Sequence, residues 1–277
     1  MNKIRRNIPN AITCGNLLCG CLAIVKAFEG DLVWAAYLVG IAAVLDFFDG
    51  FAARMLRVTS PIGKDLDSLA DMVTFGVVPG IMLLQMIQIA FSNITSKEEG
   101  LIPDAQLKSI LIHNIEHGAF IPYLALIVPI FSAIRLAKFN NDTRQADSFI
   151  GLPTPANAIF FGSFPLIISQ ISDEIRASEN PFKMLVNMSG KPILALLYNP
   201  WFLIGLAVLF SLLLVAPLPL FSLKFKFFGW QGNRMRYTFL GLSLVLIGCF
   251  KFMGIPLVIV LYILLSVVNN LYVKSRK

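Results

Sequence analysis

Two apolar stretches of the sequence each carry a pair of aspartates, with Asp46 and Asp49 in the first and Asp67 and Asp71 in the second. A carboxylate near the centre of a membrane-spanning helix costs roughly 2.5 to 3.5 kcal/mol on the insertion scale, so four of them need compensation. The basic residues between positions 45 and 71 are fewer than these carboxylates. Carboxylate-rich sites suit hard divalent cations such as Mg2+, Mn2+ or Ca2+, whereas zinc prefers nitrogen and sulfur. The four aspartates therefore predict metal-dependent chemistry at a membrane.

Helical spacing gathers these residues on one face of each stretch. Asp67 and Asp71 are four positions apart, so they share a face of the second helix. Residues 58–64 contain a proline and a glycine and are typical of a turn between antiparallel neighbours. Folding the chain at this turn is expected to bring the four carboxylates together. In the first helix, the shared face consists of Asp46, Asp49, Gly50, Ala53 and Arg54.

The residues beside the aspartates favour a ligand that contains phosphate. Gly50, Ala53 and Gly63 carry little or no side chain, so a bulky ligand can approach the backbone. Arg54 supplies a planar guanidinium, whose geometry matches phosphate oxygens. We therefore expect an anionic phosphate ligand next to the metal site.

The composition is that of an integral membrane protein. Of 277 residues, 57% are hydrophobic and 14% are charged, and the mean hydropathy is +0.75. Soluble domains usually carry about 25% charged residues. The net charge of +7 does not indicate nucleic-acid binding, because the basic residues cluster at the ends of the apolar segments. The four cysteines show no metal-ligand spacing and are interpreted as small packing residues.

The apolar segments predict an all-α bundle of about eight transmembrane helices. Basic residues are denser in alternate connections, which places both termini and the aspartates on the cytoplasmic side of the inner membrane. We expect residues 1–277 to form a single domain, with the last two spans, at 237–273, as a C-terminal extension of the core. The predicted spans are 11–28, 32–54, 66–89, 119–136, a fifth ending near 171, 201–215, 237–252 and 255–273.

The aspartate stretch reads D-x2-D-G-x2-A-R-x8-G-x3-D-x3-D and resembles the signature of the CDP-alcohol phosphotransferase family at every fixed position. The resemblance implies that the four aspartates hold two divalent cations, which bind the pyrophosphate of a CDP-linked lipid. It also implies that Asp71 acts as general base on the acceptor hydroxyl. By the same resemblance, the CDP-lipid is lined by Asp49, Gly50, Ala53, Arg54 and Gly63.

Further stretches are similar to the integral-membrane phosphatidylserine synthases of this family. They include PNAITCGNLLCGCLAI near the start, DSLADMVTFGVVPG after the aspartates and RLAKFNNDTRQADSFIGLPTPANA later in the chain. The implied reaction joins CDP-diacylglycerol and L-serine to give phosphatidylserine and CMP. Glycerol 3-phosphate and inositol phosphate are the alternative acceptors, and both would need a larger basic pocket than serine.

The resemblance also implies a homodimer. Gly76 and Gly80 form a small-xxx-small pair, which allows two membrane helices to approach closely. Glycine has many uses in a membrane helix, so the pair by itself leaves open whether its partner belongs to the same chain.

Two hypotheses come from other functional classes. A cation transporter could line its path with four membrane carboxylates, but it would not need Gly50, Ala53, Arg54 and Gly63 at these spacings. The sequence also contains His113-Asn114-Ile115-Glu116-His117, which matches the H-x-x-E-H motif of some zinc proteases. In a short polar connection, the end of an interfacial helix is the simpler interpretation.

A serine acceptor also needs a cation for its carboxylate, held apart from the aspartates. Arg54 is assigned to the donor, and the two neighbouring basic residues lie at the turn. Arg135, at the inner end of the fourth predicted span, is the remaining candidate. The alternative is that Arg135 anchors its helix at the membrane edge by snorkelling.

Overall fold

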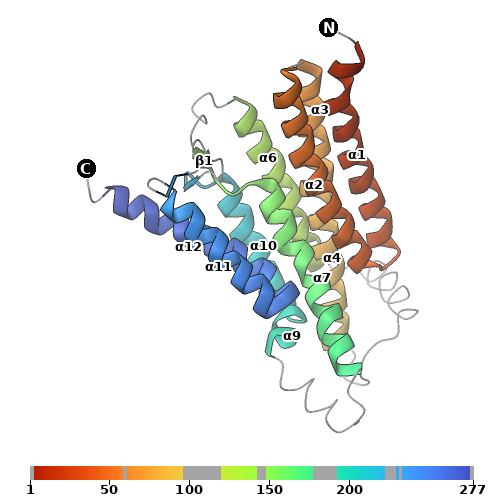
Figure 1. The fold of residues 1–277 in the computed structure, drawn as a ribbon. Helices are drawn as coiled ribbons and strands as arrows, with labels where there is room; N and C mark the ends of the chain where they lie inside the picture. Colours follow the sequence, from red (N-terminus) through yellow and green to blue (C-terminus); the bar gives the residue numbers. More distant parts are fainter. Residues whose placement is uncertain are drawn as a thin grey trace.

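The computed structural model describes residues 3–58, 61–95, 120–141, 148–176, 192–221, 229–230 and 233–274. In this part of the chain, helices account for nearly all of the regular structure (Figure 1). The helices are α1 (Lys3–Phe28), α2 (Leu32–Leu56), α3 (Pro61–Asp71), the π-helix η1 (Met72–Val77), α4 (Val78–Thr95), the 3-10 helix η2 (Ile121–Leu126), α6 (Ile127–Asn141), α7 (Thr154–Arg176), α9 (Pro192–Leu197), α10 (Pro200–Val215), α11 (Arg234–Phe250), η3 (Lys251–Met253) and α12 (Gly254–Lys274).

The predicted all-α membrane bundle is confirmed. Six helical stretches of the described residues are long and apolar enough to cross a membrane. The last of them, Arg234–Asn270, contains both α11 and α12, and α10 is a shorter apolar helix outside the six. The eight predicted spans thus correspond to α1, α2, the continuous α3–η1–α4, the continuous η2–α6, α7, α10, α11 and α12.

Local hydrogen bonds define where α2 begins and ends. At its start, the Asp31 carboxylate accepts a hydrogen bond from the Trp34 N–H at 3.0 Å, an N-cap. At its end, Arg57 takes the left-handed conformation with φ of 52°, and the Val58 N–H reaches the Ala53 carbonyl at 3.0 Å. This pattern stops the helix as a Schellman motif does.

Two helix starts near prolines lie ahead of the predicted positions, because a proline can occupy a helix start or a bend. Helix α3 begins at Pro61, so Gly63 lies within the helix and not in the predicted turn. A proline is well tolerated at the first helical position, since its missing N–H would have no helical partner there. Helix α1 begins at Lys3, ahead of the predicted start at 11, and contains Pro9 inside it.

Close packing within the chain uses the small residues of the third span. A Cβ added at Gly80 would lie 2.6 Å from the Pro129 Cδ, and one added at Gly76 would lie 3.1 Å from the Ser132 Cβ. Both neighbours belong to α6. The close contact predicted for this glycine pair is therefore made between two helices of one chain.

A short antiparallel β pair, which the sequence did not predict, ties the C-terminal helices to the bundle. Strands β1 (Ser148–Ile150) and β2 (Pro219–Phe221) pair with Ser148 opposite Phe221. The Tyr262 hydroxyl donates to the Phe221 carbonyl at 2.9 Å, and the Asn270 amide donates to the Pro219 carbonyl at 2.6 Å. Helices α11 and α12 form a slanted pair at one side of the bundle, with α12 held against β2 (Figure 1).

Candidate active site

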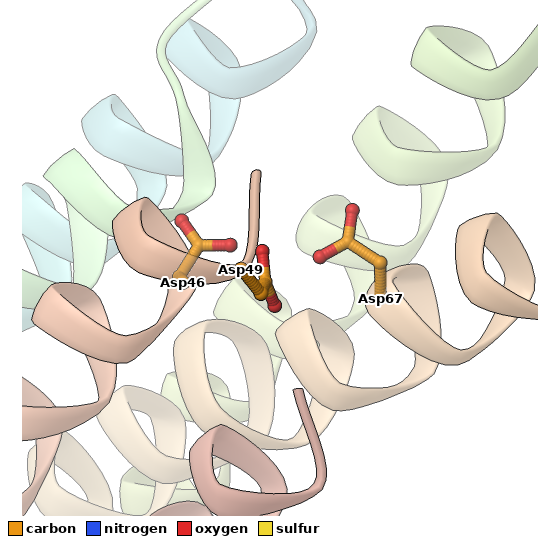
Figure 2. Close-up of side chains that lie close together, drawn as sticks. All are labelled: Asp46, Asp49 and Asp67. Carbon is orange, nitrogen blue, oxygen red and sulfur yellow. The ribbon is translucent and has the colours of Figure 1, made fainter. Parts of the chain in front are cut away.

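Three aspartate side chains from two helices meet inside the bundle. Asp46 and Asp49 project from α2 and Asp67 from α3, toward a common space (Figure 2). One carboxylate oxygen of each lies within 4.8 Å of the others. Asp49 is only 6% exposed, and the other two are half-buried. The structure thus brings three of the four predicted carboxylates together in this group.

The fourth aspartate, Asp71, lies beside this group. It follows Asp67 by one turn of α3, and the charges of Asp46, Asp67 and Asp49 act on its carboxyl group. Asp71 is half-buried at the last position of α3. The chain therefore places four carboxyl groups, two per helix, around one region of the helix bundle.

The arrangement of the four aspartates is better explained by bound divalent cations than by carboxylates without partners. Among the described residues, no Lys or Arg forms an ion pair with any of the four aspartates. The Asp67 Oδ1 is buried and has no hydrogen-bond partner in the described structure. Burying a charge without a partner is very costly, and bound metal is one of the ways proteins compensate it. The donor set is all oxygen, which matches the preference of Mg2+, Mn2+ and Ca2+.

Two further residues contact the aspartates from α1, and the sequence analysis missed both. The Thr13 hydroxyl lies 2.7 Å from the Asp49 Oδ2 and 3.0 Å from the Pro9 carbonyl. The Asn16 Nδ2 donates to the Asp71 Oδ1 at 3.4 Å. Both residues are polar, buried and three positions apart in an otherwise apolar span. That pattern, a polar pair on one face of a membrane helix, was the available sequence signal.

A π-helix follows directly after Asp71. Residues Met72–Val77 form η1, in which the Val78 N–H bonds to the Val73 carbonyl, five positions earlier. Such π segments are rare and occur frequently at functional sites. Within η1, the Thr74 hydroxyl donates to the Asn16 carbonyl at 3.2 Å. A Cβ at Gly20 would collide with the Thr74 Oγ1, so glycine is what lets α1 approach η1 this closely.

The residues assigned to the CDP-lipid lie along α2 and α3, with Gly63 in α3 and not in the predicted turn. A Cβ added at Gly50 would meet only the Arg54 Nη1, at 3.8 Å, so the guanidinium lies over the glycine. Arg54 is exposed, and Gly50, Ala53 and Gly63 are half-buried. This exposed cation beside small residues leaves room for an anionic ligand.

Arg135 is turned into the bundle and is not at the surface. It is 5% exposed, and its Nε donates to the Leu152 carbonyl at 3.0 Å. Its guanidinium also lies over the Phe139 ring, 5.0 Å from the centroid, and is close enough to Asp71 for their charges to interact. Lys138, one turn further along α6, is exposed. These contacts disagree with a snorkelling anchor, whose charged group would lie in water.

His113 and His117, the residues of the H-x-x-E-H match, lie outside the described residues. Within the described part of the chain, Asp46, Asp49 and Asp67 form the one group of three or more acidic, histidine or cysteine side chains close enough to hold a metal. The candidate chemistry is therefore concentrated at the four aspartates.

Comparison with known proteins shows the family to which the chain is similar. Residues 6–213 match the family model described as CDP-alcohol phosphatidyltransferase. A CDP-diacylglycerol–serine O-phosphatidyltransferase of Bacillus subtilis is 35% identical over 149 residues, which are 53% of this chain and 69% of that relative. One of Helicobacter pylori J99 is 34% identical over 153 residues, or 54% of each chain.

An archaeal relative extends this comparison. The archaetidylserine synthase of Methanothermobacter thermautotrophicus is 30% identical over 161 residues, 57% of this chain and 58% of its own. The matches to the Helicobacter and archaeal relatives thus span little more than half the length of those proteins. The family model covers all four aspartates, Thr13, Asn16 and Arg135.

Proposed function

The chain belongs to the CDP-alcohol phosphatidyltransferase family, and on this premise we propose that it transfers the phosphatidyl group of CDP-diacylglycerol to the hydroxyl of L-serine. The products are phosphatidylserine and CMP. The donor class follows from the family, and the serine acceptor is supported by the names of the bacterial relatives. The archaeal relative is named as a synthase of a serine lipid as well.

The observation that carries the proposal is the convergence of four carboxyl groups in a membrane protein, with no ion pair to a Lys or Arg among the described residues. Asp46, Asp49, Asp67 and Asp71 would hold two divalent cations, Mg2+ or Mn2+, with Ca2+ as an alternative. When bound, such a pair clamps the pyrophosphate, polarises the phosphorus and stabilises the departing CMP.

In this proposal Asp71 is the general base. It accepts the proton of the serine hydroxyl as the serine oxygen forms its bond to the β-phosphorus, the atom that carries diacylglycerol. The bond between this phosphorus and the bridging oxygen breaks, and CMP leaves with that oxygen and its electron pair. The hydrogen bond from Asn16 orients the Asp71 carboxylate for this step, because it occupies one of the two carboxylate oxygens.

The two substrates would be held on either side of the aspartates. Arg54 would bind the donor phosphates beside Gly50, where Ala53 and Gly63 leave space. Arg135 would bind the carboxylate of serine, since it is buried and interacts with Asp71. The acyl chains of the donor would stay in the bilayer, next to the exposed apolar faces of the helices.

The setting of the enzyme is also part of the proposal. Positive residues at the ends of the spans support cytoplasmic termini and an active site near the cytoplasmic side of the inner membrane. We treat 1–277 as one domain, with 237–273 as a C-terminal extension, since the family match ends at residue 213. A homodimer stays a proposal from family resemblance, because Gly76 and Gly80 pack within the chain.

A panel of acceptors tests the function. The purified protein in detergent is mixed with labelled CDP-diacylglycerol, and L-serine, glycerol 3-phosphate, inositol phosphate or no acceptor is added. We expect labelled phosphatidylserine and CMP with serine when Mg2+ or Mn2+ is present. Addition of EDTA should abolish the product, and restoring the divalent cation should recover it.

The same panel separates the alternatives. Product formation with a phosphate-bearing acceptor and none with serine would keep the family and replace the acceptor. If no acceptor releases CMP at any metal concentration, while the protein in vesicles takes up divalent cations, the transporter hypothesis replaces the enzyme.

A further inference from the structure

Of the two polar atoms in the Asn16 side chain, only one has a hydrogen-bond partner among the described residues. Its Nδ2 donates to the Asp71 Oδ1 at 3.4 Å, whereas its Oδ1 is buried and has no partner among the described residues. The residue itself is 0% exposed. A buried acceptor without a donor is costly, so a native site commonly supplies the donor from water or a ligand.

The orientation of this amide follows from its neighbour. If the amide were flipped, its oxygen would face the Asp71 carboxylate, and two acceptors would repel each other. The hydrogen-bond network therefore assigns the NH2 group to Asp71 and leaves the oxygen as the unpaired atom. The two atoms share one carbon, so the unpaired oxygen lies next to the carboxylate that would deprotonate the acceptor.

The position of Asn16 is itself held from η1. The Thr74 hydroxyl donates to the Asn16 carbonyl at 3.2 Å, and Gly20 lets α1 come close to Thr74. A side chain fixed in this way loses little freedom when it binds a ligand, which favours a recognition role.

The chemistry of the acceptor substrate suggests which donor group pairs with the Asn16 Oδ1. Serine carries an ammonium group on the carbon next to its hydroxymethyl group, and its carboxylate extends from that same carbon. With the hydroxyl at Asp71 and the carboxylate at Arg135, the ammonium is the remaining group, and it has three N–H donors and no acceptor. A neutral amide oxygen is a suitable partner for it beside a site that is already crowded with carboxylates.

We propose that the Asn16 Oδ1 binds the ammonium group of an amino-acid acceptor and so makes the enzyme specific for acceptors with an amino group next to the hydroxymethyl carbon. This inference rests on the proposed function. It assigns the three polar groups of serine to three residues: hydroxyl to Asp71, carboxylate to Arg135 and ammonium to Asn16.

The test compares acceptors that each lack one group. kcat/KM is measured for L-serine, for 3-hydroxypropanoate, which lacks the ammonium, and for ethanolamine, which lacks the carboxylate. The wild-type protein should prefer serine over 3-hydroxypropanoate by about tenfold to a hundredfold, the range expected for one hydrogen bond to a charged group. In Asn16→Leu this preference should shrink to about twofold or less, and the preference over ethanolamine should persist.

Matched variants and a binding measurement complete the design. Asn141→Leu, at an exposed asparagine whose amide bonds within its own helix, should leave all the ratios unchanged. Asn16→Asp keeps an acceptor oxygen and should keep most of the discrimination, even where kcat falls. The Kd of L-serine in the presence of CMP and Mg2+ should rise about tenfold or more in Asn16→Leu.

Each contrary result has a distinct meaning. A wild-type protein that uses serine and 3-hydroxypropanoate equally well overturns the inference, and this requires no variant to fold. Equal losses of kcat with every acceptor in Asn16→Leu would make the residue a support for Asp71 alone. Failure of the wild-type protein to use serine at all would instead count against the proposed function.

Discussion

Helices α1 to α3 and helix α12 all carry polar side chains within apolar spans, but these side chains differ in whether they have hydrogen-bond partners in the chain. On α12, Tyr262 and Asn270 donate to carbonyls of β2, and the Ser266 hydroxyl donates to the Tyr262 carbonyl at 2.7 Å. Each of these groups thus has a partner in the chain. Near the aspartates, by contrast, the Asp67 Oδ1 and the Asn16 Oδ1 are buried without one.

The difference separates polar groups that hold the fold from groups that fit a ligand. A satisfied polar group joins one element to another, and its loss should be felt mainly in stability. An unsatisfied group adds nothing to the stability of the protein alone, because it has given up water without gaining a partner. Its loss should be felt mainly in binding or turnover. Substitutions on α12 should therefore change mainly stability, and substitutions near the aspartates should change mainly binding or turnover.

Replacing the proposed base should have the largest effect. Asp71→Asn preserves the size of the side chain and its contact with Asn16, but removes its capacity to accept a proton. We expect kcat with serine to fall about 10²- to 10⁴-fold, with the melting temperature in detergent unchanged or raised. Asp65→Asn, the same substitution at an exposed position of α3, is the control and should retain activity. A near-normal kcat for Asp71→Asn would remove the base assignment.

The next largest effect is expected at Arg135. Arg135→Gln should raise the KM for serine about tenfold to a hundredfold, because a charge-assisted hydrogen bond to the carboxylate is lost. The KM for CDP-diacylglycerol should stay nearly constant. Lys138→Gln, at the exposed cation on the same helix, should change neither value. If Arg135→Gln lowers stability and leaves the KM for serine unchanged, Arg135 belongs with the residues that hold the fold, through its bond to Leu152.

Arg54 should show a smaller, donor-side effect. A lysine at this position keeps the charge but not the two parallel N–H groups that match phosphate. Arg54→Lys is expected to raise the KM for CDP-diacylglycerol by about tenfold, with a smaller change for serine. Arg57→Lys, at the exposed end of α2, serves as the control. The reverse pattern, with serine more affected than the donor, would move Arg54 to the acceptor side.

The smallest effect on activity should come from α12. Tyr262→Phe removes the hydrogen bond to the Phe221 carbonyl and should cost about 1 kcal/mol of stability. We expect a lower melting temperature in detergent and a kcat/KM within about twofold of the wild type. Tyr37→Phe, at an exposed tyrosine of α2, should change neither. If Tyr262→Phe loses much of its activity without a change in stability, the assignment of α12 to the fold and not to the site is wrong.

Much of this fold could be predicted because the membrane restricts the possible structures. Long apolar segments can satisfy their backbone groups only as helices or closed barrels, so the spans and the all-α class followed from hydropathy. The convergence of Asp46 and Asp49 with Asp67 followed from helical spacing and one connection. The start of α3 at Pro61 was missed, because a proline can begin a helix as well as occupy a turn.

The parts that escaped prediction depend on contacts between distant residues. Thr13 and Asn16 contact aspartates 36 and 55 positions away, and no local pattern specifies these partners. The β1–β2 pair joins segments about 70 residues apart, each only three residues long. The burial of Arg135 likewise depends on a carbonyl in the next connection, at Leu152. A membrane-edge anchor and an inward-facing cation look the same in the sequence.

The π-helix η1 affects the directions in which the helix faces before and after it point within the third span. Its turns are closed by bonds between residues five apart, so η1 uses more residues per turn than the α-helices on either side. The face that presents Asp67 and Asp71 is therefore rotated out of step with the face by which α4 packs into the bundle. Removing a single residue from Met72–Val77 would undo this rotation. Either the face with Asp67 and Asp71 or the packing face of α4 would then turn away from its partners. Chain length within η1 should be far less tolerant of change than side-chain identity.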